Sequence, residues 1–120
     1  MHLENLRQFI KNPLLSLIFG ISILINLINF TALFLFLRRL NNVIILHYNV
    51  YLGVDIFGHR RQALFMPFVG FFFILVNLIL AYYFFSQKER LISHVLSLTT
   101  LIIQLGLTVA GASIIMVNYL

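Results

Sequence analysis

The chain has no cysteine, and only three of its 120 residues are acidic. Without cysteine there can be no disulfide, no thiolate nucleophile and no cysteine-ligated zinc or iron–sulfur site. The acidic residues Glu4, Asp55 and Glu89 supply no paired carboxylates, and the chain lacks a glycine-rich phosphate loop. We therefore predict that the protein is not an enzyme and has no catalytic residue and no cofactor.

Charge of either sign is scarce, and this shortage decides the class of the protein. Charged residues make up 9% of the chain and apolar residues 62%, whereas a soluble domain is about half apolar and about a quarter charged. A water-facing surface needs more charge, so the sequence predicts an integral membrane protein. The net charge is +5, but the basic residues stand in small groups at the ends of apolar runs. That distribution is typical of contact with the lipid bilayer, and we predict no nucleic-acid partner.

Three long apolar runs predict three transmembrane helices, over residues 13–37, 67–85 and 91–119. As a helix, the uncharged stretch 14–37 is about 36 Å long, enough to cross a hydrocarbon core of about 30 Å. The link before the third run is short, so the second and third helices should form an antiparallel pair. The predicted fold class is an all-α membrane protein: three transmembrane helices with a long, partly extended loop between the first two.

Several residues mark where these helices begin and end. Asn12 can cap the first helix, and Pro13 suits its first position, where a missing N–H costs nothing. Pro67 opens the second run. Tyr82 and Tyr83, near the end of that run, fit the aromatic belt of a membrane interface.

The N-terminal segment 1–12 has two interpretations. Leu3, Leu6 and Ile10 share one helical face, so the segment could be an interfacial helix lying on the membrane surface. The alternative is a frayed, solvated tail.

The basic residues of the chain do not settle its orientation in the membrane under the positive-inside rule. Four basic residues fall on each side of the membrane, Arg7, Lys11, Lys88 and Arg90 against Arg38, Arg39, Arg60 and Arg61.

Uncharged polar residues and glycines recur at helical spacing inside the predicted spans. In the third span six of them fall within an arc of about 80°, namely Ser93, Ser97, Thr100, Gln104, Thr108 and Gly111. The first span has Ser22, Asn26 and Asn29 on one face, and the second has Gly70 and Asn77. Polar groups in hydrocarbon need partners, so we predict a three-helix bundle with intramembrane polar contacts among Asn26, Asn29, Asn77 and Gln104. The alternative is a polar pathway, which the absence of charge and of an inverted repeat disfavours.

The connection 38–66 is longer than most structureless loops, which favours a structured surface loop with a function. From residue 44 to residue 56, apolar even positions alternate with mostly polar odd positions, as in an extended strand. Gly53 could permit a bulge or a sharp turn. The loop could therefore turn back on itself, or its edge could pair with another protein.

The polar residues of this loop have a structural and a metal-binding interpretation. The structural one has His47 and Asn49 bonding backbone groups to hold the loop on the bundle, with Tyr48 and Tyr51 as interface anchors. A metal site would need His47, Asp55 and His59 to converge, although an extended chain separates the first two by about 26 Å. We therefore predict no metal. At the loop ends, Arg38, Arg39, Arg60 and Arg61 are predicted to contact lipid headgroups or another anion.

The stretch "LHYN" after a transmembrane run, followed by a glycine, an aspartate and a proline-started run, also carries a resemblance. It resembles a small bacterial membrane domain of unknown function near the N-terminus of Sdp-type toxin-immunity proteins, and short three-span bacterial proteins with a similar loop. His47, Tyr48 and Asn49 match its first motif, while Gly53 and Asp55 match its second loosely. The usual proline before the histidine is absent, Arg60 and Arg61 replace a lysine, and the further spans of the immunity proteins are missing. The match covers about residues 21–85.

The resemblance implies a bacterial inner-membrane protein with the N-terminus inside and the loop outside. Together with the composition, it leads us to predict a non-enzymatic accessory or interaction module that packs with a larger membrane-protein partner or binds through the loop. Two alternatives stay open. One is a toxin-immunity or envelope-stress protein, and the other is a small pore or transporter formed as a homo-oligomer.

Overall fold

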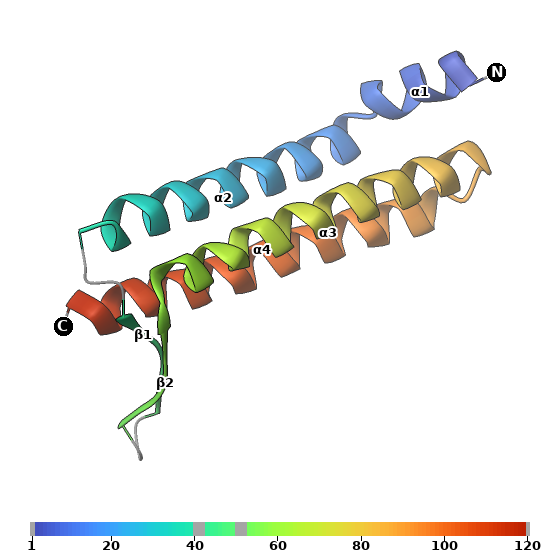
Figure 1. Cartoon of the computed structure of the whole chain (residues 1–120). Coiled ribbons are helices and arrows are strands. Elements are labelled where there is room, and N and C mark those ends of the chain that lie inside the picture. Colours follow the sequence, from blue (N-terminus) through green and yellow to red (C-terminus); the bar gives the residue numbers. More distant parts are fainter. Residues whose placement is uncertain (1, 40–42, 50–52, 120) are drawn as a thin grey trace.

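Four helices and a two-stranded hairpin make up the computed structural model, which describes residues 2–39, 43–49 and 53–119. In chain order the elements are α1 (His2–Lys11), α2 (Pro13–Leu37), β1 (Val43–Asn49), β2 (Gly53–His59), α3 (Arg60–Ser86) and α4 (Arg90–Tyr119). Figure 1 shows α2, α3 and α4 side by side as a bundle, with α3 antiparallel to the other two. The hairpin projects from one end of the bundle, close to the C-terminus, and α1 lies at the other end.

The three bundle helices are each long and apolar enough to cross a membrane, which fits an integral multi-pass membrane protein. The prediction of three long apolar helices is thus confirmed. The predicted start of α2 is also confirmed, because the side-chain oxygen of Asn12 accepts a hydrogen bond of 3.0 Å from the backbone N–H of Leu15. Pro13 occupies the first turn, where no intrahelical donor is lost.

The predicted start of the second span at Pro67 is wrong. α3 begins at Arg60 and contains Pro67 in its interior, so the loop predicted over 38–66 ends at residue 59. A proline inside a helix removes one backbone hydrogen bond. Here the turns before it are held by packing, because Ala63 is buried in an apolar cluster with Leu33, Leu37 and Ile114. Tertiary contacts therefore extend the helix beyond the point at which local preference would begin it.

A tight turn joins α3 to α4. Lys88 has a positive φ of 65°, and its N–H donates to the carbonyl of Phe85 at 3.1 Å, while the N–H of Glu89 donates to the carbonyl of Phe84 at 2.8 Å. This pair of bonds is the Schellman arrangement, which satisfies the last carbonyls of a helix and reverses the chain. The antiparallel pairing predicted from the short link follows directly.

Along its length the bundle interior has three layers. At the α1 end an apolar and aromatic cluster contains Phe9, Leu15, Phe19, Ala81 and Phe85. At the hairpin end a second apolar cluster contains Leu33, Leu37, Ile44, Ala63 and Ile114. Between the two clusters, the inward positions hold buried polar side chains. The apolar layers bury the helix ends, while the polar layer sets which faces of the helices meet.

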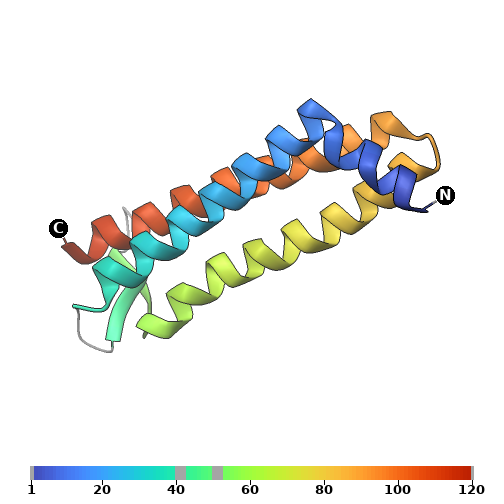
Figure 2. The same ribbon diagram turned by 90° about the horizontal axis from the view of Figure 1, so that it is seen from above.

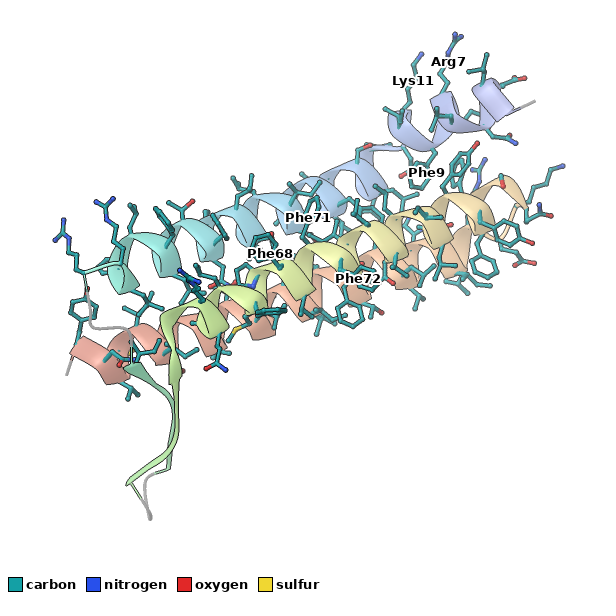
Figure 3. The ribbon with its side chains drawn as sticks, in the orientation of Figure 1. Arg7, Phe9, Lys11, Phe68, Phe71 and Phe72 are labelled. Atoms are coloured by element: carbon teal, nitrogen blue, oxygen red, sulfur yellow. The ribbon has the colours of Figure 1, made fainter. Side chains whose placement is uncertain are left out.

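Among the described residues of α1, Phe9 is the one whose side chain is buried against the bundle. The ring of Phe9 lies 5.5 Å from that of Phe85 and 5.7 Å from that of Tyr82, both edge-to-face. Figure 2 shows α1 crossing the end of the bundle toward α3. In Figure 3, Phe9 points toward the bundle, whereas Arg7 and Lys11 point away from it. Leu3, Leu6 and Ile10 remain exposed, and their predicted contact with the membrane surface stays a prediction.

Candidate functional site

The polar layer joins all three bundle helices through Asn26 of α2 and Gln104 of α4. The side-chain amide of Asn26 donates to the carbonyl of Pro67 at 2.9 Å and to the side-chain oxygen of Gln104 at 3.1 Å. The amide of Gln104 donates in turn to the carbonyl of Gly70 at 2.9 Å. Both carbonyl acceptors belong to α3, so two side chains link three helices. An amide can do this because it carries two N–H donors and a carbonyl acceptor.

Two further hydrogen bonds join α3 to α4 nearer the turn between them. Asn77 donates to the hydroxyl of Thr100 at 2.8 Å, and the hydroxyl of Ser93 donates to the carbonyl of Ala81 at 2.6 Å. Ser93, Thr100 and Gln104 lie at steps of seven and four residues, so they share one face of α4. That face is the polar stripe of the sequence analysis, and the structure buries five of its six members, Ser93, Ser97, Thr100, Gln104 and Gly111.

Asn29 of α2 lies against Gly111 of α4. Asn29 is 4% exposed, and its amide donates to the carbonyl of Leu107 at 3.4 Å. A Cβ atom placed on Gly111 would collide with the side-chain oxygen of Asn29. A Cβ on Gly70 would come within 2.8 Å of the amide of Asn26. The glycines therefore provide the space in which the asparagines reach their acceptors, as small residues do between membrane helices.

The polar layer is closed on itself. Among the side chains that the structure describes, every buried nitrogen or oxygen has a hydrogen-bond partner. A polar group in hydrocarbon that already has its partners gains nothing from an ion or solute. Chemically, the layer is suited to holding three helices in one register.

We expect Asn26 and Gln104 to be energetically coupled. In a double-mutant cycle with Asn26→Leu and Gln104→Leu, the coupling free energy should be about 0.6 kcal/mol and at most about 1.7 kcal/mol, the range for hydrogen bonds between membrane helices. Unfolding in mixed detergent micelles would measure it. As a control, Asn26→Leu combined with Ser93→Ala should be additive within about 0.5 kcal/mol. If the coupling free energy between Asn26 and Gln104 is no larger than that of this control pair, the hydrogen-bond assignment is wrong.

The hairpin connects α2 to α3 and is seated on the bundle by Ile44. β1 and β2 pair antiparallel from Val43 opposite His59 to Asn49 opposite Gly53, with shifts in register around His47. Ile44 is 2% exposed and belongs to the apolar cluster formed by α2, α3 and α4. The stretch with the period-two pattern thus contains two paired strands, and one apolar residue near the base fixes them to the bundle.

The predicted loop residues lie in or beside this hairpin. The backbone of His47, Tyr48 and Asn49 belongs to β1, and that of Gly53 and Asp55 belongs to β2. The side chains of the four residues other than Gly53 lie outside what the structure describes, as does the whole of Tyr51. Their predicted roles as loop anchors or as metal ligands stay predictions. Among the residues that the structure describes, no three His, Cys, Asp or Glu residues come together.

The predicted basic residues fall around two hollows at the hairpin end of the bundle. Arg38 and Arg61 line one of them. Arg38 and Arg39 line the other, together with Leu35, Phe36 and Tyr119. The side chain of Arg60 lies outside the described part of the structure. The structure thus brings together Arg38 and Arg61, which the sequence separates by the whole loop.

Two residues that anchor other segments to the bundle, Phe9 and Ile44, were not predicted from the sequence. Phe9 lies off the face formed by Leu3, Leu6 and Ile10. An aromatic residue outside that apolar face could have indicated a contact with the bundle. Ile44 was one of many alternating apolar residues, and nothing local distinguished it from its neighbours. The carbonyls of Pro67 and Gly70 were also missed as hydrogen-bond acceptors, because backbone groups leave no mark in a sequence pattern.

No family model, no curated protein and no solved structure matches the chain. The resemblance to the toxin-immunity domain therefore rests on the motif around His47 alone and stays a prediction.

Proposed function

We propose that this protein is a non-enzymatic membrane module whose three-helix bundle holds the hairpin at the membrane surface for a larger membrane-protein partner. The observation that carries the proposal is the seating of Ile44 among three helices whose interior is closed by its own hydrogen bonds. A bundle with this interior serves as a support. The hairpin is the element that it supports.

The exterior of the bundle favours this function over a pore. Large apolar side chains are exposed along all three bundle helices, for example Leu24 of α2, Phe72 of α3 and Ile102 of α4. Helices that line a water-filled axis need a polar face toward it. In the described bundle the main polar stripe instead faces inward and is already hydrogen-bonded.

We place the protein in a bacterial inner membrane with the N-terminus inside and the hairpin outside. In this orientation α1 lies on the cytoplasmic surface, its exposed Leu3 and Ile10 in the interface and its basic Arg7 and Lys11 near anionic headgroups. The hairpin is then available to a partner in or beyond the outer leaflet.

Purification of the full chain from its native membrane in mild detergent tests the proposed partner. We expect one membrane protein to copurify in stoichiometric ratio. His47→Ala combined with Asn49→Ala should weaken that association about tenfold, which corresponds to about 1.4 kcal/mol. Gln87→Ala, at the opposite end of the bundle, is the matched control and should leave it unchanged.

Other outcomes would replace the proposal. A partner retained by the double variant would exclude the hairpin as the contact. Recovery of the chain alone as an oligomer with a water-accessible axis would support a pore. Loss of toxin resistance in cells that carry the double variant, with normal expression and no copurifying partner, would support an immunity protein.

A further inference from the structure

A hollow of about 320 Å³ lies between the end of α2 and the start of α3. Its lining is of two kinds, apolar side chains and two guanidinium groups. The six lining residues are Leu33, Phe34, Leu37, Arg38, Arg61 and Leu64. Ligand pockets in proteins begin at about 300 Å³, so the hollow is large enough to take part of a small amphiphile.

The apolar and charged parts of the hollow lie at different depths. Leu33 and Leu37 are buried and form its inner wall, whereas Phe34 is 46% exposed and forms an outer wall toward the surroundings of the bundle. Arg38 follows the last helical residue of α2. Since a helix rises about 1.5 Å per residue, the apolar wall from Leu33 extends about 7 Å deeper than Arg38. The hollow therefore crosses the boundary between the apolar span and its charged end.

The charged end favours an anion. Arg38 comes from the end of α2 and Arg61 from the first turn of α3, so two elements contribute positive charge. A guanidinium binds a phosphate through two parallel hydrogen bonds, which adds geometric selectivity to the charge.

We propose that this hollow seats one anionic phospholipid. Its phosphate lies between Arg38 and Arg61, and the glycerol and the start of one acyl chain lie against Phe34, Leu37 and Leu64. A ligand with an anionic head and an apolar tail is the chemistry that satisfies both kinds of lining, and a bilayer supplies it at high local concentration. Lipid binding here does not depend on the proposed membrane-protein partner.

Native mass spectrometry of the full chain tests this proposal, with phosphatidylglycerol and phosphatidylcholine as probes. We expect one phosphatidylglycerol to be retained in preference to phosphatidylcholine. An arginine near the headgroups contributes about 1 kcal/mol to binding an anionic surface, so Arg38→Gln and Arg61→Gln should each weaken binding about fivefold. Arg39→Gln removes the same charge beside the hollow without touching its lining. It should weaken binding less than Arg38→Gln does, because Arg38 and Arg61 would also lose their hydrogen bonds to the phosphate.

Two further measurements separate a lipid from a free phosphate. Phe34→Ala removes apolar wall and should weaken phosphatidylglycerol binding while leaving any binding of inorganic phosphate unchanged. Inorganic phosphate and glycerol phosphate should compete poorly, because they lack the acyl chain. If they displace the lipid fully and Phe34→Ala has no effect, the hollow takes a free phosphate and the lipid assignment is wrong.

The proposal is also overturned if both lipids bind equally, or if Arg39→Gln weakens binding as much as Arg38→Gln. Arg61→Lys covers the case in which a glutamine variant fails to fold. It keeps the charge but loses the paired hydrogen bonds, so we expect weaker binding by about twofold to fivefold with unchanged helix content. If Arg61→Lys binds phosphatidylglycerol as well as the native chain does, Arg61 makes no paired hydrogen bonds to the phosphate, and the proposed lipid site is wrong.

Discussion

Gly111→Leu is expected to separate α4 from α2 and to lower the stability of the bundle. A Cβ atom on Gly111 would already collide with the side-chain oxygen of Asn29, and it would lie 3.4 Å from a methyl group of Leu33. Overpacking of a close contact usually costs about 1–3 kcal/mol, and leucine adds three further carbon atoms to that collision. Unfolding in mixed micelles, followed by circular dichroism, would measure the loss of free energy.

Gly106→Leu is the matched control. Gly106 lies in the same helix, and no atom comes within 4 Å of a Cβ atom built on it. Leucine there should be neutral or slightly stabilising, because its helix propensity is more favourable than that of glycine by about 1 kcal/mol. A second test is Gly111→Ala with Asn29→Ala, in which the truncated side chain makes room and should restore part of the stability lost with Gly111→Ala alone. Equal effects at Gly106 and Gly111 would show that α2 and α4 do not meet at this point.

Ile44→Ala is expected to release the hairpin from the bundle. The side chain is 2% exposed and packs with residues of α2, α3 and α4. Truncation of such a buried side chain to alanine typically costs about 2–5 kcal/mol. Because Ile44 is the described contact that seats the hairpin, we expect that cost to appear as local opening of 43–59, while the three helices stay folded. Amide hydrogen exchange in that segment should accelerate by at least about thirtyfold, the factor for about 2 kcal/mol.

Leu35→Ala provides the comparison for this experiment. Leu35 is at the same end of α2 but is 43% exposed on the outside of the bundle, so its truncation should leave exchange in the hairpin unchanged. If the backbone amides of 43–59 already exchange without protection in the native chain, Ile44 does not hold the hairpin on the bundle. Loss of helix content in Ile44→Ala would mean instead that the hairpin and the bundle unfold together.

Much of the bundle could be predicted from the sequence because its signals are local and repeated. Apolar runs without charge predicted three long helices, and Asn12 with Pro13 predicted where the first begins. Polar residues at steps of three and four predicted the inward face of α4, and the amides of Asn26 and Gln104 lie together in the bundle core. Each of these follows from the periodicity of a single helix and from the cost of an unpaired polar group in hydrocarbon.

The start of α3 could not be predicted in this way. Pro67 favours a helix beginning, and a local interpretation begins the helix there. In the structure Ala63 packs against two other helices, and that contact keeps the preceding turns helical. The attachment of α1 through Phe9 and the seating of Ile44 are of the same kind. Both depend on contacts between segments distant in the chain, which no local pattern encodes.

By itself, the sequence determined the class of this protein: three long apolar helices, too little charge for a water-facing surface, and a polar stripe that needs partners. Only the tertiary structure decided which partners those are, where α3 begins, and that Arg38 and Arg61 line one hollow. The physical reason is the range of the interactions. Hydrophobicity and helical period act within a segment and can be read along it. Hydrogen bonds, close glycine contacts and shared cavities arise only once three segments lie side by side.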